Sequence, residues 1–284
     1  MILQLNLATL AVAGQVAWKR AKPIVFRDVV LLPAAGFLGV ILLWWVVALA
    51  NHELMPTPPE ALAANLDYIL NPFYERGPGN LGIGWLLLAS IRRVLLGFLL
   101  GAVVAIPVGF LIGMSRKAML AINPIIQIFK PVSPLAWLPI ALAIFNLADP
   151  SAIFVIFITS LWPTIINTAL GVSSVSKDYI DVARVLEMPR WRRITKIIWP
   201  ASLPYIFTGL RISLGIAWLV IVAVEMLTGG IGIGFFVWDE WSRLNLSSVF
   251  LAVLVIGLTG LLLDYIVGKI QELVTHRSAR NTTV

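Results

Sequence analysis

Long apolar segments recur along this sequence, and short polar connections separate them. Hydrophobic residues make up 60% of the 284 residues and charged residues only 12%. Soluble domains average about 45–50% apolar and about 25% charged residues. A chain of this composition buries its apolar surface in lipid, so we predict an all-α protein that crosses a membrane several times.

Six segments are long and apolar enough to span a bilayer as helices, which takes about 20 residues each. The second carries glycines at helical spacing, which lets helix backbones approach closely. The third is irregular, because several prolines interrupt it and each removes a backbone donor. The predicted spans are 29–50, 86–114, 118–145, 151–172, 205–227 and 247–268.

The distribution of cations predicts the orientation of these spans. With six spans both termini share one side with the 115–117 turn and the 173–200 loop, and 15 of the 21 cations lie there. The positive-inside bias therefore places both termini and the 173–200 loop in the cytoplasm. It also explains the net charge of +7 without nucleic acid. Residues 1–28 form a cytoplasmic segment with an interfacial helix, 29–272 the membrane domain, and 273–284 a cytoplasmic tail.

Several kinds of catalytic and cofactor site are excluded. The chain has no cysteine, its two histidines lie far apart, and it has no G-x-x-x-x-G-K-[ST] loop for ATP. The glycine run 229–234 follows a membrane helix, so close packing or flexibility explains it better than nucleotide binding. We therefore predict no catalytic residue, no metal site and no bound cofactor. Active transport would need a partner that hydrolyses ATP, or an ion gradient.

One polar stretch, residues 177–204, interrupts the apolar pattern. Good helix formers at 180–186 predict a helix that ends before Pro189, and 190–199 predicts a second helix with isoleucines and Trp191 near one face. Pro200 and Pro204 frame the start of the fifth span. This predicts a short helical hairpin lying flat on the cytoplasmic side. A basic amphipathic loop resting on anionic lipid is the alternative interpretation.

The spacing inside this hairpin resembles the "EAA" loop of bacterial ABC-importer permeases, whose pattern is EAA, three residues, Gly, nine residues, Ile, one residue, Leu-Pro. Here Asp181-Val182-Ala183 is followed at those spacings by Glu187, Ile197 and Trp199-Pro200. Glu187 replaces the Gly that permits a tight turn in the family, and Pro189 is expected to supply the bend instead. The resemblance implies a helix that couples to an ATPase through Asp181, Val182, Ala183, Arg184, Glu187, Met188, Pro189, Ile197 and Pro200.

The resemblance covers roughly residues 30–272. Segments 90–98, 130–139, 209–211 and 223–225 look like the nitrate/sulfonate/taurine branch of these permeases, and 160–168 and 234–241 look most like its nitrate and bicarbonate members. The family implies a type I importer in a bacterial inner membrane. It consists of two permease copies, two cytoplasmic ATPases that use ATP and Mg²⁺, and an external substrate-binding protein. This chain would then be a non-enzymatic subunit.

Charged residues inside predicted spans are expensive and point to function by default. Lys130 and Arg211 are candidates for an anion path, as are Arg92 and Arg93 near the outer mouth. Alternatively Arg92 and Arg93 extend to lipid headgroups, and Arg211 anchors the cytoplasmic end of the fifth span. Glu225 either lies on the path or pairs with a cation inside the bundle.

The sequence thus predicts a permease that moves a small inorganic anion inward, with nitrate (and nitrite) as the first choice. Bicarbonate comes second, followed by sulfonates, taurine and cyanate. A self-contained secondary transporter is the main alternative of another class, but it predicts an internal repeat and leaves the 177–204 hairpin without a role. An intramembrane enzyme lacks a nucleophile–base pair or metal set.

Overall fold

The computed structural model describes residues 26–51, 55–77 and 79–281, and these are almost entirely helical. The predicted interfacial helix at 1–28 falls almost wholly outside the described residues. The chain divides into two units, 1–61 and 62–284. The elements are α2 Phe26–Ala50, α3 Pro58–Ala64, α4 Leu66–Leu70, α5 Ile83–Met114, α6 Arg116–Phe129, η1 Pro134–Trp137, α7 Leu138–Phe145, α8 Ala148–Ser173, α9 Lys177–Val185, α10 Arg190–Arg193, η2 Ile194–Ile198, α11 Trp199–Thr228, α12 Ile233–Ser242 and α13 Leu246–Asn281.

The described part of the first unit contains the apolar helix α2 and the segment that follows it. In α2, residues Val30–Ala50 are long and apolar enough to cross a membrane. Near its end the indole Nε1 of Trp44 donates to the carbonyl of Pro56 at 3.1 Å. A tryptophan that hydrogen-bonds a polar connection is typical of the membrane–water boundary, as predicted for the first span.

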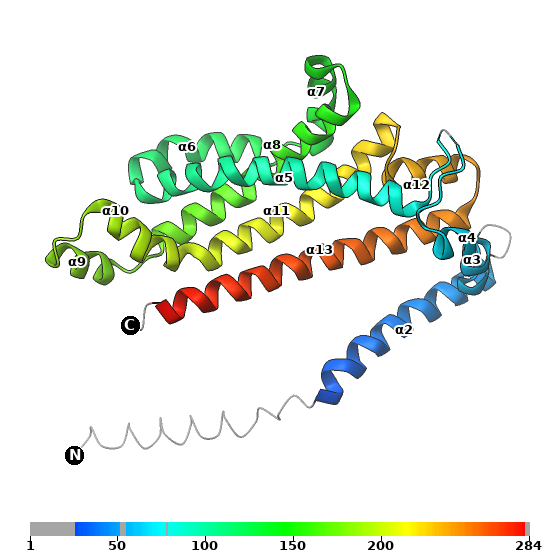
Figure 1. Ribbon diagram of the computed structural model, residues 1–284, viewed down its shortest axis with the longest axis horizontal. Coiled ribbons are helices and arrows are strands. Elements are labelled where there is room, and N and C mark those ends of the chain that lie inside the picture. The colour runs from blue at the N-terminus through cyan, green and yellow to red at the C-terminus, as the bar shows by residue number, and fades with distance from the viewer. Residues whose placement is uncertain (1–25, 52–54, 78, 282–284) are drawn as a thin grey trace. The chain divides into compact units, whose positions relative to one another are not determined.

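Helices α5, α8 and α11 pack side by side and form the core of the second unit (Figure 1). Glycines of α5 make the approach to α8 possible. A methyl group added at Gly97 would lie 2.7 Å from the carbonyl oxygen of Ile153, and one at Gly109 would lie 2.6 Å from Cβ of Thr168. The predicted close packing through helically spaced glycines is confirmed, since any side chain there would force the two helices apart.

The third predicted span is a bent pair of helices. α6 and the η1–α7 segment meet at 92°, and Lys130, Pro131 and Pro134 lie at the break. The prolines cannot continue the hydrogen-bond ladder of α6, which explains why the helix ends there. Within the part of the chain that the structure describes, five single helices, or six spans when this pair counts as one, have the length and apolarity to cross a membrane.

The last helix extends beyond the predicted sixth span, and a further helix lies in the connection before it. α13 does not stop near residue 268 but continues to Asn281, so most of the predicted tail 273–284 is helical. The Gly-rich connection after α11 is a turn at 229–232 followed by α12, which packs against α11 and α13. Within the second unit, α9 and α10 lie at one end of the long helices, and α4 and α12 lie at the other (Figure 1).

Candidate functional site

The first arm of the hairpin, α9, is stabilised by an N-terminal cap and by charges near its two ends. The hydroxyl of Ser176 accepts a hydrogen bond from the backbone N–H of Asp178 at 3.3 Å. Asp178 lies in the first turn and Arg184 in the last, so both charges complement the helix dipole. Arg184 also pairs with Asp181 at 2.8 Å. A nine-residue helix is marginal in isolation, and these local contacts explain why it forms here.

The turn after α9 is a Schellman motif with Glu187 in the left-handed region, at φ 51°. The N–H of Met188 donates to the carbonyl of Ala183, and the N–H of Glu187 donates to the carbonyl of Arg184, both at 2.9 Å. The prediction that Pro189 supplies the bend in place of the family Gly is wrong. Glu187 adopts the conformation that favours glycine, because the two hydrogen bonds of the motif hold it there.

The second arm is not a separate helix, and this corrects the predicted hairpin. A continuous helical segment runs from Arg190 to Thr228. Its π turn, η2, lies directly before Pro200, where the N–H of Trp199 donates to the carbonyl of Ile194, five residues back. Pro200 has no N–H, and in a regular α-helix its ring would collide with the carbonyl of Lys196. The wider π turn lets the helix pass the proline without a break.

The hairpin exposes an unusual set of apolar side chains for a segment rich in charge. Val185 is 83% exposed, while Ala183 on the opposite side of α9 is buried at 1%. The exposed set, named the outer face below, comprises Tyr179, Val182, Val185, Leu186 and Trp191. Exposed apolar side chains on a segment that is predicted to lie outside the membrane are typical of a surface that binds another protein.

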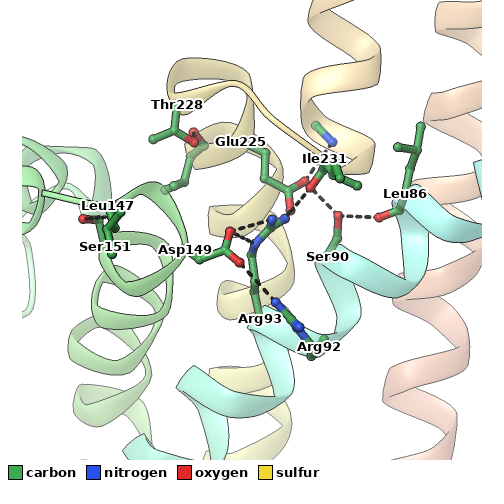
Figure 2. Close-up of polar contacts among 12 residues, drawn as sticks. Leu86, Ser90, Arg92, Arg93, Leu147, Asp149, Ser151, Glu225, Thr228 and Ile231 are labelled. Atoms are coloured by element: carbon green, nitrogen blue, oxygen red, sulfur yellow. Dashed lines mark hydrogen bonds and ion pairs between the residues drawn. The ribbon is translucent and has the colours of Figure 1, made fainter. Parts of the chain in front are cut away.

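Three predicted charges, Arg92, Arg93 and Glu225, lie at the other end of the long helices, around Arg93 of α5 (Figure 2). Arg93 is buried, with 7% of the residue exposed. It pairs through Nη2 with Asp149 of α8 at 2.7 Å, and through Nη1 with Glu225 of α11 at 2.7 Å. Nη1 also donates to the carbonyl of Ile231 at 2.6 Å. Arg93 therefore joins three helices and the glycine turn, and its alternative role at lipid headgroups is wrong.

The carboxylate of Glu225 has a full set of partners. Besides Arg93 it accepts a hydrogen bond from the hydroxyl of Ser90 at 2.8 Å and from the N–H of Gly234 at 3.0 Å. The N–H of Ile233 donates to Ser90 at 3.0 Å. These contacts satisfy N–H groups at the start of α12. A methyl group at Gly232 would lie 2.3 Å from the Glu225 carboxyl carbon, so the glycine run serves close packing.

Two other predicted cations, Arg92 and Lys130, are largely exposed. Arg92 pairs with Asp149 at 3.1 Å but stays 65% exposed. Lys130 is exposed at the end of α6, and no ion-pair partner for it exists among the described residues. The structure thus separates cations that the sequence treats alike. The guanidinium of Arg93 is paired with two carboxylates, whereas Arg92 and Lys130 keep exposed N–H donors.

Arg211 forms a bidentate pair with Asp264 of α13, with Nε–Oδ1 at 2.9 Å and Nη2–Oδ2 at 2.6 Å. The two side chains remain 41% and 49% exposed. Arg211 lies twelve residues past Trp199, or about 18 Å along α11, so it is well inside the helix and not at its end. The ion pair links α11 to α13 and leaves part of both side chains exposed.

A cavity of about 910 Å³ opens at the end of the bundle opposite the hairpin. Its wall includes the exposed pair Asp67–Arg76 and residues 230–232 of the glycine turn. The guanidinium of Arg76 holds the pKa of the Asp67 carboxyl below its usual range. Burial raises the pKa of the neighbouring Tyr68. Both side chains therefore keep their ordinary charge near neutral pH.

The sequence prediction missed three members of these networks. Asp264 interrupts an apolar run and is an in-membrane charge that hydropathy alone marks. Asp149 lies just before the predicted fourth span, 151–172, and its role depends on α8 packing beside α5. Ser90 lies in the family-like segment 90–98, but its role could not be predicted because it depends on a contact with Glu225, 135 residues away. Among the described residues no group of three or more potential ligands is placed to hold a metal ion.

Comparison with known proteins identifies the family. The model of the binding-protein-dependent transport system inner membrane component matches residues 97–279. The chain belongs to this family. It is 43% identical to the nitrate import permease of Synechocystis sp. over 250 residues, covering 88% of this chain and 91% of the relative. It is 44% identical to the bicarbonate transport system permease of Synechococcus elongatus over 248 residues, covering 86% and 89%.

The fold agrees with this assignment. The chain superposes on a chain of the inward-facing methionine ABC transporter MetNI with a TM-score of 0.59, covering 66% of this chain and 94% of that one at 16% identity. The predictions of an all-α type I permease fold and of the ABC-importer permease family are therefore confirmed. The chain is a transmembrane permease subunit of an importer, and ATP hydrolysis belongs to a separate subunit.

Proposed function

We propose that this permease carries nitrate, and nitrite with it, into the cell. The observation that supports this best is its similarity to nitrate permeases, which reaches 46% identity with that of Leptolyngbya laminosa. Bicarbonate is the second candidate, since the bicarbonate permeases are 44% identical. Nitrate and bicarbonate are both small, planar, singly charged oxyanions, so one path accommodates either.

Uptake by the complete transporter distinguishes the two substrates. The permease would be reconstituted in vesicles with its cognate ATPase and binding protein, with ATP supplied to the ATPase side. We expect isotopically labelled nitrate to accumulate, and a tenfold excess of unlabelled nitrate to compete better than bicarbonate. Accumulation of bicarbonate without nitrate would reverse the assignment. The retention of one anion by the isolated binding protein provides an independent check.

We further propose that the outer face of the hairpin binds the cytoplasmic ATPase, with Asp181, Val182, Ala183, Arg184, Glu187, Met188 and Pro189 forming the coupling segment. The exposure of Val185 and Trp191 supports a surface that a partner covers. Since the helix continues from Arg190 through Ile197 and Pro200 into α11, a movement of the hairpin would carry the whole rod with it. The other end of that rod holds Glu225, about 50 Å away.

Three predicted partners complete the proposed complex: a second copy of this chain, two ATPase subunits that bind ATP and Mg²⁺, and an external binding protein. We place both termini, including 1–28 and 273–284, on the cytoplasmic side of a bacterial inner membrane, with 29–272 as the permease domain. The Arg211–Asp264 pair supports a subunit interface or water-filled path on its face, because lipid would not solvate it.

Among the predicted path residues, Lys130, Arg92 and Arg211 are the ones we propose to attract the anion. Each retains exposed surface, and Lys130 lies at a break in the third span, where irregular backbone is tolerated beside water. Arg93 and Glu225 are better suited to stabilise the packing of the helices, since each is buried and already paired. A secondary transporter remains distinguishable: it would accumulate the anion in vesicles that lack the ATPase and ATP.

A further inference from the structure

A groove of about 560 Å³ lies on the inner side of the hairpin, between it and the ends of two membrane helices. Its walls include Gly113 and Met114 at the end of α5, and Val172 and Ser173 at the end of α8. These are the last residues of two candidate membrane spans. The groove therefore lies at the level where lipid headgroups meet the acyl region.

The charged part of the groove is entirely basic. Its lining contains four cations and no acid: Lys177, Arg184, Arg190 and Arg193. Arg184 is paired with Asp181, which lies outside the lining. The side chains of the other three have no ion-pair or hydrogen-bond partner among the described residues. Three unpaired cations around one concavity produce a positive potential that favours an anionic ligand.

The remaining wall is apolar and follows a helical stripe. Arg190, Arg193, Ile194 and Ile197 recur at three- and four-residue spacing along α10 and η2, so cations and isoleucines share one face. Ile194 and Ile198 pack against the buried cluster that contains Phe110 and Val172. A ligand that fits this groove needs an anionic head and an apolar body.

We propose that the groove binds an anionic phospholipid, with its phosphate on Lys177, Arg190 and Arg193 and its first acyl carbons along the isoleucines. A soluble phosphate would satisfy the cations but leave the apolar wall uncovered. The groove and the outer face lie on opposite sides of α9: Lys177, Ile180 and Arg184 line the groove, and Val182 and Val185 do not. A bound lipid therefore leaves the outer face free for an ATPase.

The consequence is that lipid holds the hairpin in place. The groove includes residues from both arms and from the ends of α5 and α8, so one ligand bridges four elements. Its occupancy should stabilise the hairpin relative to the membrane helices, whichever anion is transported. The proposal depends on the membrane level of the hairpin and not on nitrate as substrate.

The test uses the full chain purified in neutral detergent. Phosphatidylglycerol, phosphatidylcholine with the same acyl chains, or inorganic phosphate is added, and bound lipid is counted by native mass spectrometry while thermal unfolding is followed. We expect phosphatidylglycerol alone to remain bound and to raise the Tm. Equal retention of phosphatidylcholine would overturn the proposal, and so would equal stabilisation by phosphate, which would indicate a site for a free anion.

Two charge-matched variants locate the site. Arg190→Gln with Arg193→Gln should weaken phosphatidylglycerol binding about 25-fold, since each cation near an anionic headgroup contributes about fivefold. Arg192→Gln with Lys196→Gln removes the same charge from exposed positions outside the groove and should change binding less than twofold. Equal losses in both variants would mean unspecific attraction. If the first variant does not fold, Lys177→Gln replaces it: about fivefold weaker binding is expected, and unchanged binding overturns the proposal.

Discussion

The two ends of this permease use the same residue types in opposite ways. Around Arg93 every charge is paired within the chain. The side chain of Arg93 is 9% exposed and that of Glu225 is 3% exposed. On the hairpin, Arg184 pairs with Asp181 at 67% and 61% exposure, and Lys177, Arg190 and Arg193 have no described partner. The charges around Arg93 are paired within the chain, whereas three cations of the hairpin remain available to bind a ligand.

This difference has a physical basis. A buried charge without a partner is very costly, so the Arg93 cluster tolerates no missing member. Exposed cations are hydrated, so leaving them unpaired costs little folding free energy. The cations of the hairpin can therefore stay unpaired until a ligand binds them. We infer that the buried cluster serves the integrity of the permease and that the hairpin serves its associations. The predictions below test that division, from the largest expected effect to the smallest.

Arg93→Ala should have the largest effect, because it leaves the carboxylate of Glu225 buried without its cation. We expect a loss of about 3–5 kcal/mol in unfolding free energy, measured as lower Tm and lower abundance of folded permease in detergent.

The neighbour Arg92 provides the control, since its side chain is 65% exposed and pairs only with Asp149. Arg92→Ala should cost less than about 1 kcal/mol. The double replacement of Arg93 and Glu225 by Leu should recover part of the stability lost in Arg93→Ala. Equal losses for Arg92→Ala and Arg93→Ala would contradict the structural role of the cluster.

Val185→Asp should weaken ATPase binding by about 2 kcal/mol, or about 30-fold, because it puts a charge in the middle of the apolar outer face. The measurement is co-purification of the cognate ATPase, with the Tm of the isolated permease unchanged. Leu244→Asp is the matched control, because Leu244 is also 83% exposed but lies between α12 and α13, at the other end of the bundle. ATPase retained by the Val185→Asp variant would remove the hairpin as the binding surface.

Lys130→Ala should slow anion uptake about tenfold at subsaturating anion, since it removes an unpaired cation worth about 1.4 kcal/mol to an anion in a partly desolvated path. Folded abundance should stay within twofold, because the side chain has no described partner to lose. The comparison is the ratio of uptake to abundance. A parallel decrease of uptake and abundance would show that Lys130 stabilises the fold and does not act on the anion path.

Glu187→Gly should have the smallest effect and the opposite sign. Relief of the left-handed backbone at φ 51° should stabilise the turn by about 1 kcal/mol. Slower hydrogen exchange of the Glu187 and Met188 amides, which close the motif, would report it. Asn146→Gly is the control: Asn146 has φ 54°, but asparagine tolerates this region, so the gain should be smaller. Faster exchange in Glu187→Gly would show that the Glu187 side chain has a role of its own.

The sequence predicted the large elements well, because hydropathy over about 20 residues depends on composition and not on contacts. The predicted second, fourth and fifth spans correspond to α5, α8 and α11, and the glycines of α5 were correctly assigned to close packing. It failed where a local rule was overridden. Segment 190–199 was predicted as a helix separate from the fifth span, but the π turn before Pro200 lets one helix continue through both. The family Gly position held a Glu, and hydrogen bonds from Met188 and Glu187 maintained the same turn.

By itself the sequence determined the class of the protein: apolar runs, the cation bias and the spacing from Asp181 to Pro200 all follow from residue order. Only the tertiary structure decided the roles of individual charges. Arg92 and Arg93 are neighbours in sequence, yet one faces outward and the other joins α5, α8 and α11. The reason is that the energy of a charge depends on what surrounds it, and its surroundings come from helices more than 50 residues away.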